Sequence, residues 1–282
     1  NLLKEIIEFS IQLLDSNNQD IVIPKGIKDK LLSTLLQNVK ENPSSNEDGR
    51  FFFENSPPLQ DLMAKVFACS LINLHVRIIG PTGAGKTSFA REFARIRPIT
   101  LNKKMAKFLM QSFSSETKPI DCFLKPTIKD KQFGLNKGPL LLSMVNGLTI
   151  ILDEFNLSLP STMKSIAPAL EPIDNKEINI SGIDDPIVIH PNLFIIICEN
   201  ETNYRGRNNI PSSIEPRFRV FKYPELEIED LSSTAIDISN SFYDEDEIKS
   251  KSFSNEEAGK VGEYMYKLNK SQIMNQTLSI RD

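Results

Sequence analysis

The sequence predicts an α/β fold in which a parallel five-stranded sheet is flanked by helices. Five short apolar runs have the length and residue types of buried strands, and helical patterns lie between several of them. Hydrophobic residues make up 40% and charged residues 25% of the 282 residues, which is close to the usual globular balance. Apolar strands that alternate with helices are typical of a parallel sheet covered on both faces.

The expected strands are residues 76–79, 107–111, 148–152, 193–198 and 219–223. Helical periodicity covers residues 59–71 and 87–95 on either side of the first strand, and residues 138–145 and 159–170 around the third. Residues 174–189 alternate around Asn175 and Ser181-Gly182, which predicts a β-hairpin. Residues 100–107 and 112–133 are rich in polar residues and include two prolines, so we expect loops there.

Composition shifts divide the chain into three parts. Residues 1–50 hold helical patterns at 2–14 and 27–39 and then a polar linker, either a leading segment or the end of a preceding module. Residues 51–224 contain the predicted sheet, and residues 225–282 are acidic, notably at Asp244–Glu247, and mostly helical in composition. Because the chain begins with Asn1 rather than Met, we expect it to be a piece of a longer protein.

Charge and composition exclude several classes of function. With 33 Lys and Arg against 37 Asp and Glu, the net charge of −4 gives no global attraction to nucleic acid or anionic membrane. The apolar runs are far shorter than the roughly 20 residues of a membrane span. Three isolated cysteines argue against a disulfide framework or a cysteine zinc site and favour a reducing compartment. His75 and His190 each precede a predicted strand, and we expect structural roles for both.

The strongest motif is a phosphate-binding loop that matches the pattern Gly-x-x-x-x-Gly-Lys-Ser/Thr in full. Its glycines let successive N–H groups point at phosphate oxygens, and the helix that begins at Lys86 adds the positive end of its dipole. Lys86 would contact the β- and γ-phosphates, and the Thr87 hydroxyl would bind Mg²⁺. A glycine-rich turn with a chance lysine is the alternative, but the strand before and the helix after favour the phosphate loop. The predicted nucleotide-binding residues are Gly80, Pro81, Thr82, Gly83, Ala84, Gly85, Lys86, Thr87 and Ser88.

Two acidic residues, Asp153 and Glu154, close a buried strand that we expect to lie beside the first strand. Asp153 would hold Mg²⁺ through water, and Glu154 would act as the general base for the attacking water. An acidic pair after a strand is also compatible with a solvated loop, but the phosphate loop favours the catalytic interpretation.

Two further features carry weaker signals. Asn200 follows the strand 193–198 and could orient the attacking water, although asparagine commonly ends strands; Glu199 beside it is expected to point elsewhere. Four arginines gather between residues 205 and 219 in an otherwise acidic chain. An arginine near an oligomer interface can reach the γ-phosphate of a neighbouring subunit. A surface cluster of weak ion pairs is an equal alternative.

The order of these motifs resembles that of AAA+ ATPases, and within them the dynein-related, midasin-like group. The resemblance covers about residues 51–223. Its further elements are Phe52-Phe53-Glu54-Asn55-Ser56, Gly138-Pro139-Leu140, Asp153 to Ser158, His190 to Phe194, and Gly206-Arg207 to Arg217-Phe218, with Leu278 to Asp282 near the chain end. The sequence departs from the group at Glu201, where proline is frequent, and at Pro216, which directly precedes Arg217.

The resemblance implies a P-loop AAA+ core that binds ATP and Mg²⁺, with an incomplete helical lid over residues 225–282. It implies that Asn200 is the first sensor of the γ-phosphate, that Arg217 is the finger offered to a neighbour, and that Arg281 is the lid sensor. The hairpin at 174–189 corresponds to the insert in the second helix of the group. The implied partners are neighbouring AAA+ modules in a ring and a protein or ribonucleoprotein substrate, without membrane or sequence-specific nucleic acid.

Two functions remain open from the sequence. The first is an active ATPase module of a ring-forming remodelling protein, for example one that matures the large ribosomal subunit. The second is a module that binds nucleotide without hydrolysing it, in a dynein-like ring or a giant AAA-containing ubiquitin ligase. The presence of Glu154 favours activity, and a small-molecule kinase would leave Asp153-Glu154 and Asn200 unexplained. We expect an intracellular protein, nuclear if midasin-like and otherwise cytoplasmic.

Overall fold

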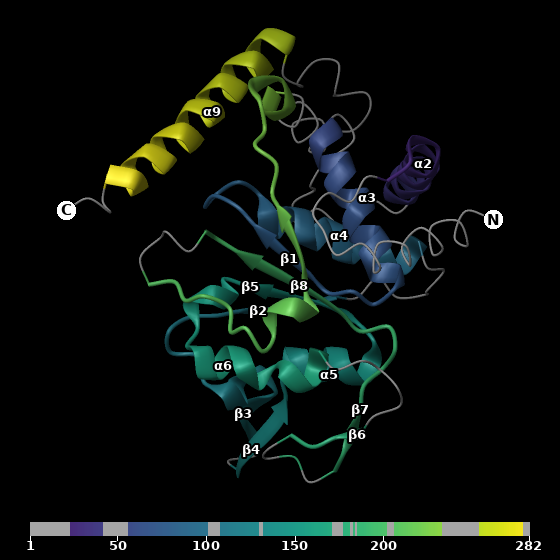
Figure 1. The fold of residues 1–282 in the computed structure, drawn as a ribbon, viewed down its shortest axis with the longest axis vertical. Coiled ribbons are helices and arrows are strands. Elements are labelled where there is room, and N and C mark those ends of the chain that lie inside the picture. Colours follow the sequence, from purple (N-terminus) through teal and green to yellow (C-terminus); the bar gives the residue numbers. More distant parts are fainter. Residues whose placement is uncertain are drawn as a thin grey trace.

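The central sheet has five parallel strands in the order β2-β5-β8-β1-β9 (Figure 1). We describe a computed structural model that places residues 23–41, 56–100, 108–129, 132–170, 177–180, 183, 185–201, 206–232 and 254–278. The strands of the sheet are β1 (Val76–Ile79), β2 (Phe108–Ser112), β5 (Thr149–Asp153), β8 (Phe194–Glu199) and β9 (Arg219–Lys222). The five predicted strands are thereby confirmed within two residues.

Helices cover both faces of this sheet. The helices are α2 (Lys25–Glu41), α3 (Pro57–Leu71), α4 (Lys86–Thr100), α5 (Pro139–Asn146), α6 (Pro160–Ser165) and α9 (Asn255–Leu278). Helices α2, α3 and α4 lie on one face, and α5 and α6 lie on the other with two small hairpins (Figure 1). Helix α9 lies on the side of the sheet opposite α5 and α6 (Figure 1), and its Ala258 is buried.

The core forms because side chains of the inner strands alternate between the two faces. In β8, Phe194 and Ile196 pack with α3 and α4, whereas Ile195 and Ile197 pack with α5 and α6. All four side chains are fully buried. A strand that is buried on both faces needs an apolar side chain at nearly every position, which is why these runs lack an apolar–polar alternation.

Proline and glycine mark the ends of the helices on the second face. Helix α5 begins at Pro139 and ends before Gly147, whose φ of 65° lies in the left-handed region. The predicted helix 159–170 is interrupted, because α6 ends at Ser165 and a short 3₁₀ turn, η4 (Ala167–Leu170), follows. Pro168 explains the break, since proline has no N–H to donate and disfavours helix in the residue before it.

The prediction of loops over residues 112–133 was wrong for most of the segment. It contains a 3₁₀ turn, η2 (Pro119–Cys122), and β3 (Leu124–Lys129), which pairs antiparallel with β4 (Gln132–Lys137). Pro126 lies inside β3 opposite Leu135. Proline is tolerated in a two-stranded ribbon because each strand has a free edge, whereas in a central strand it would remove a ladder hydrogen bond.

The predicted hairpin at 174–189 is present as β6 (Glu177–Ile178) paired with β7 (Ile187–Val188). Its assignment to the second helix of the core was wrong. The hairpin follows η4 and precedes β8, whereas the helix between β2 and β5 is α5, directly preceded by β3 and β4. Short segments with two paired residues each leave little sequence signal for their place in the fold.

The strand of the acidic pair does not lie beside β1, contrary to the prediction, because β8 lies between β5 and β1. Strand order is set by packing of distant segments, so the residues of one strand do not encode it.

Several predictions fall outside the described residues: the helix at 2–14, the lead-in Phe52–Asn55, residues 101–107, the acidic run Asp244–Glu247, and Arg281. Within the part of the chain that is described, no helix is both long and apolar enough to cross a bilayer.

We predict that Gly147→Ala destabilises the fold. A methyl group at Gly147 would lie 2.2 Å from His190 Nδ1, and the left-handed backbone disfavours alanine. The expected loss is about 2 kcal/mol or more of unfolding free energy, measured by urea denaturation. Gly259→Ala in helix α9 is the matched control, because nothing lies within 4 Å of the added methyl group. This control should gain up to about 1 kcal/mol, and an equal response of both variants would contradict the prediction.

We predict that His75 makes stability depend on pH below neutrality. His75 is buried beside Phe194, and its Nδ1 accepts a hydrogen bond from the Ile195 N–H at 3.3 Å. Burial, aided by the charge of Arg97, lowers the pKa of His75 from 6.5 to about 4. Between these values the unfolded chain binds more protons than the native chain, so stability falls as pH falls.

The measurement compares wild type with His75→Gln in urea at pH 7 and pH 4.5. The wild-type protein should lose about 2–3 kcal/mol more than the variant over this interval, because the variant has no imidazole to protonate on unfolding. Parallel pH profiles for the two proteins would show that His75 does not cause the slope.

Candidate functional site

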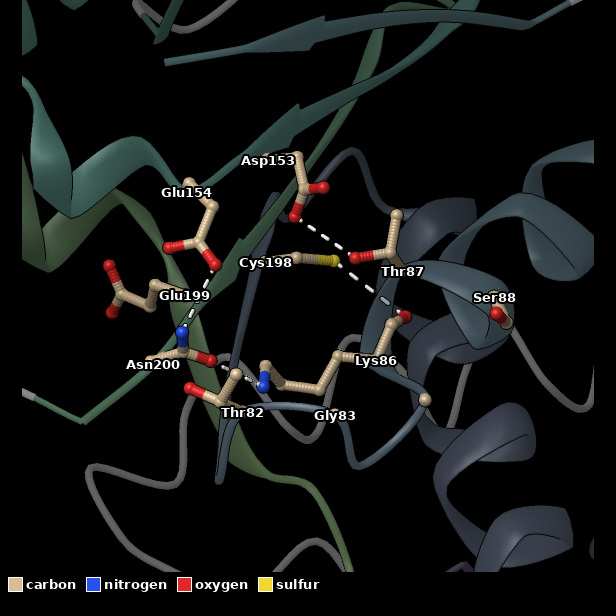
Figure 2. Close-up of a pocket in the computed structure, with 11 residues that line it drawn as sticks. Thr82, Gly83, Lys86, Thr87, Ser88, Asp153, Glu154, Cys198, Glu199 and Asn200 are labelled. Carbon is tan, nitrogen blue, oxygen red and sulfur yellow. Dashed lines mark hydrogen bonds between the residues drawn. The ribbon is translucent and has the colours of Figure 1, made fainter. Parts of the chain in front are cut away.

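A pocket opens at the carboxyl edge of the sheet, between the loop after β1 and the ends of β5 and β8 (Figure 2). The pocket brings together most of the predicted site residues, which come from three separate segments of the chain. The lining residues are Thr82, Gly83, Gly85, Lys86, Thr87, Ser88, Asp153, Glu154, Cys198, Glu199 and Asn200. The carboxyl edge of a parallel sheet is where such folds bind ligands.

The loop between β1 and α4 has the backbone that its sequence predicts. Gly83 and Gly85 have φ values of 77° and 96°, which only glycine adopts readily. These glycines turn the chain so that α4 begins at Lys86 with its first turn facing the pocket. The first N–H groups of a helix have no intrahelical acceptor, so they are available to an anion.

Lys86 directs its ammonium group along this loop. Its Nζ donates to the carbonyl oxygens of Gly80 at 3.0 Å and Pro81 at 2.5 Å, and to Asn200 Oδ1 at 2.8 Å. Lys86 is 6% exposed, and burial lowers its pKa below the usual lysine value. Because these three acceptors are uncharged, the buried ammonium group can still attract an entering anion.

Thr87 and Asp153 meet across the pocket. Thr87 Oγ1 donates to Asp153 Oδ1 at 3.0 Å, although two strand spacings separate β1 from β5. The first turn of α4 spans this distance. Burial raises the pKa of Asp153, and the Thr87 hydrogen bond opposes that shift. Mg²⁺ commonly takes one or two protein oxygens together with phosphate oxygens, so this hydroxyl and carboxylate fit such an ion.

Asn200 lies between Lys86 and Glu154 because β8 lies between β1 and β5 (Figure 2). Its amide Nδ2 donates to Glu154 Oε1 at 3.0 Å, while its Oδ1 accepts from Lys86. Glu154 has a φ of 56°, rare outside glycine, and its N–H donates to the Cys198 carbonyl at 2.9 Å. Strained backbone of this kind concentrates at functional sites, where surrounding contacts hold it.

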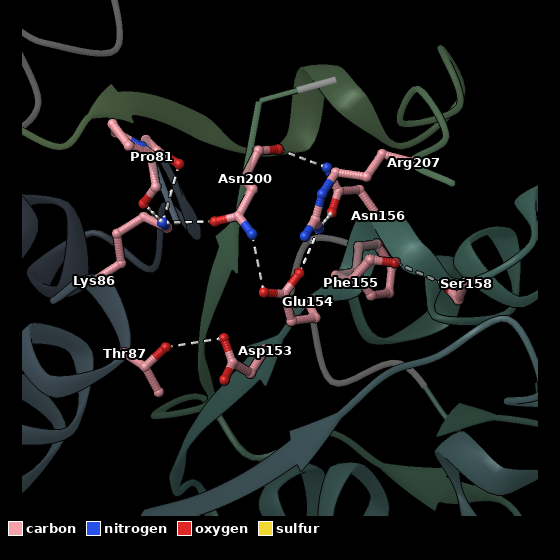
Figure 3. Close-up of polar contacts among 11 residues, drawn as sticks. Pro81, Lys86, Thr87, Asp153, Glu154, Phe155, Asn156, Ser158, Asn200 and Arg207 are labelled. Carbon is pink, nitrogen blue, oxygen red and sulfur yellow. Dashed lines mark hydrogen bonds and ion pairs between the residues drawn. The ribbon is translucent and has the colours of Figure 1, made fainter. Parts of the chain in front are cut away.

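Arg207 is a site residue for which no individual role was predicted. Its Nη1 forms an ion pair with Glu154 Oε2 and donates to Asn156 Oδ1 at 2.8 Å (Figure 3). Asn156 in turn donates from Nδ2 to the Asn200 carbonyl at 2.7 Å. The signal that was available is the arginine cluster itself, but nothing local shows which arginine reaches Glu154.

Glu199 points elsewhere, as predicted. Its carboxylate accepts hydrogen bonds from Arg77 Nε at 3.0 Å and Arg77 Nη2 at 2.5 Å, and both residues are buried. Burial raises the pKa of Glu199, and the Arg77 charge opposes the rise. Arg77 Nη1 also lies 3.5 Å from Glu215 in the 3₁₀ turn η5 (Glu215–Arg217). A charged residue inside the apolar strand β1 was the available signal of a buried partner.

The roles that the resemblance implies for Arg217 and Arg281 are not tested by the described pocket. Arg217 lies on η5 after Pro216, and it is not among the residues that line the pocket. Arg281 lies outside the described residues. Both assignments stay predictions.

Comparisons with known proteins find two relatives that are similar to part of this chain. The chain is 25% identical over 172 residues to midasin from Giardia intestinalis, which is 60% of this chain and 3% of that protein. It is 28% identical over 101 residues to midasin from Dictyostelium discoideum, covering 36% of this chain and 2% of that protein. The chain therefore spans only a few per cent of the length of these relatives.

A solved structure shares the fold. The crystal structure of a proposed ATPase from Cytophaga hutchinsonii matches with a TM-score of 0.52 at 15% identity, covering 93% of this chain and 66% of that one. Residues 75–218, from the residue before β1 to the residue after η5, match the family described as AAA domain (dynein-related subfamily). The chain therefore belongs to the AAA domain family, in its dynein-related subfamily.

Proposed function

We propose that this chain is a module that binds ATP with Mg²⁺ and hydrolyses it. One observation carries the proposal: the glycine-rich loop after β1, the Thr87–Asp153 pair, and Asn200 beside Glu154 line one pocket. The residues of this pocket come from three separate segments, after β1 and at the ends of β5 and β8, which the sheet brings together. Family membership supports ATP as the nucleotide.

The residues divide the chemistry among themselves. Lys86 and the first N–H groups of α4 bind the β- and γ-phosphates, with Lys86 exchanging the loop carbonyls for phosphate oxygens. Glu154 accepts the proton of the attacking water, and Asn200 fixes the position of Glu154 and of that water. Thr87 and Asp153 hold Mg²⁺, which when bound neutralises charge on the phosphates.

We further propose that the module works beside other AAA modules in a ring. Arg217, on the turn after Pro216, would be the residue offered to the neighbouring module's γ-phosphate. Residues 225–282 would form part of a lid whose motion follows hydrolysis, with Arg281 as its sensor. The similarity to midasin supports a parent protein that remodels a protein or ribonucleoprotein substrate, with ribosomal large-subunit maturation as one candidate process.

A binding-only module is the second candidate. It is favoured by the observation that both carboxylate oxygens of Glu154 already have partners, Asn200 on one side and Arg207 on the other. If these contacts persist when nucleotide is bound, Glu154 cannot approach a water freely. The module would then serve a ring structurally, as in a dynein-like ring or a giant AAA-containing ubiquitin ligase.

We predict that Glu154→Gln abolishes turnover and preserves binding. Glutamine keeps the size and the Asn200 contact but cannot accept the proton, so phosphate release with Mg²⁺ and ATP should fall about 100-fold or more. ATP affinity, measured by equilibrium titration, should change by less than about threefold. Glu177→Gln, at an exposed position on β6, is the matched control and should match wild type.

We predict that Lys86→Ala impairs binding itself. Loss of a charged hydrogen-bond donor to phosphate should weaken ATP affinity about tenfold or more in the same titration. Wild-type binding without any turnover would favour the binding-only module. Full ATP affinity in Lys86→Ala would contradict the assignment of the pocket.

A further inference from the structure

The carboxylate of Glu154 is fixed from two sides by groups of its own chain (Figure 3). Asn200 donates to Oε1 at 3.0 Å, and Arg207 pairs with Oε2. The Glu154 side chain is 34% exposed, whereas that of Arg207 is 9% exposed. An ion pair whose cation is largely buried fixes geometry better than an exposed one, because screening and side-chain freedom are both reduced.

Arg207 is itself held by a dedicated set of contacts. Its Nη1 also donates to Asn156 Oδ1 at 2.8 Å, and Asn156 is 1% exposed. The neighbouring Asn208 donates from its backbone N–H to the Asn156 carbonyl at 2.8 Å and from Nδ2 to the Ser158 carbonyl at 3.0 Å. The segment after β8 is thus tied to the turn after β5, which places the guanidinium beside Glu154.

Two other charged residues near the site, Glu199 and Lys86, help to explain why Arg207 pairs with Glu154. Glu199 feels the charge of Arg207, but its carboxylate already accepts two hydrogen bonds from Arg77. Lys86 feels the charge of Glu154, and it is the residue that a phosphate needs. An arginine on the far side of Glu154 therefore holds that carboxylate where it does not pair with Lys86.

We propose that Arg207 is a positioning residue for Glu154, supplied by the same module that carries the phosphate loop. This proposal rests on the proposed hydrolysis, in which Glu154 is the base. It separates two arginine roles within one short segment: Arg207 orients the base in its own pocket, and Arg217 is the arginine offered to a neighbour. Arg207 acts on the reaction only through the carboxylate that it holds.

The test compares Arg207→Ala, Arg207→Lys and the control Arg91→Ala, an exposed arginine on α4 whose guanidinium contacts Met110 Sδ at 3.4 Å. We measure kcat and KM for ATP hydrolysis and the Kd of the non-hydrolysable analogue AMP-PNP. Arg207→Ala should lower kcat about 10- to 100-fold, since misplacing a catalytic group by about 1 Å has effects of that size. The Kd should stay within about threefold of wild type.

Arg207→Lys should recover part of the lost kcat. Lysine keeps the charge, but its flexible stem fixes an ammonium group less firmly than the planar guanidinium, whose Nη1 contacts both Glu154 and Asn156. Arg91→Ala should match wild type. The proposal is overturned if Arg207→Ala keeps kcat within twofold, or if its AMP-PNP affinity falls in parallel with kcat, which would indicate a general structural role.

A second measurement separates this proposal from the proposed function. Glu154→Ala, Arg207→Ala and the double variant are unfolded in urea without nucleotide. A coupled pair predicts that the double variant loses less stability than the two single losses combined. If wild type binds ATP without hydrolysing it, the proposed hydrolysis fails, and with it the catalytic consequence of the Arg207 contact. Additive losses in this cycle would overturn the Arg207–Glu154 coupling itself, whether or not the protein hydrolyses ATP.

Discussion

A hydrogen-bonded chain from Lys86 through Asn200 to Glu154 holds the candidate site together. It runs across the ends of three neighbouring strands, because β1 leads into the loop of Lys86, β8 leads into Asn200, and β5 leads into Glu154. Asn200 can bridge the cation and the carboxylate since its amide has both an acceptor and a donor. Because of the sheet order, one asparagine connects the lysine that would bind phosphate to the candidate base.

The site also has to tolerate three carboxylates close to where a polyanion would bind. Each of them has a partner in its own chain: Asp153 accepts from the Thr87 hydroxyl, whereas Glu199 and Glu154 each pair with an arginine, Arg77 and Arg207 respectively. The pair of Arg77 and Glu199 is buried within the sheet, where removal of one partner would leave an uncompensated charge. Lys86 is thereby left to neutral acceptors and remains available to phosphate.

Much of the fold was predictable because the inner strands are mostly apolar and each is followed by glycine or polar residues. The strand with Ile195–Ile197 and the loop with Gly83 and Gly85 have local sequences that allow few other structures. The strand order was not predictable in the same way. Insertion of β8 between β1 and β5 depends on packing between distant segments, and this insertion places Asn200 between its two partners.

Other features escaped prediction for identifiable reasons. The ribbon of β3 and β4 contains Pro126 and many polar residues, which locally favour a loop, and only mutual pairing makes it a hairpin. The choice of Arg207 over the other arginines depends on Asn156, a residue 51 positions away in the sequence. Contacts between side chains so far apart follow from the fold and leave no trace in either segment alone.

The most direct test of the account is a crystal structure of the chain with AMP-PNP and Mg²⁺. The account predicts the γ-phosphate within hydrogen-bond distance of Lys86 Nζ and the Asn200 side chain, the metal ion at Thr87 Oγ1, and Glu154 facing the γ-phosphate. A nucleotide bound away from this pocket, or a Lys86 that still donates to the Gly80 and Pro81 carbonyls while nucleotide is bound, would contradict it.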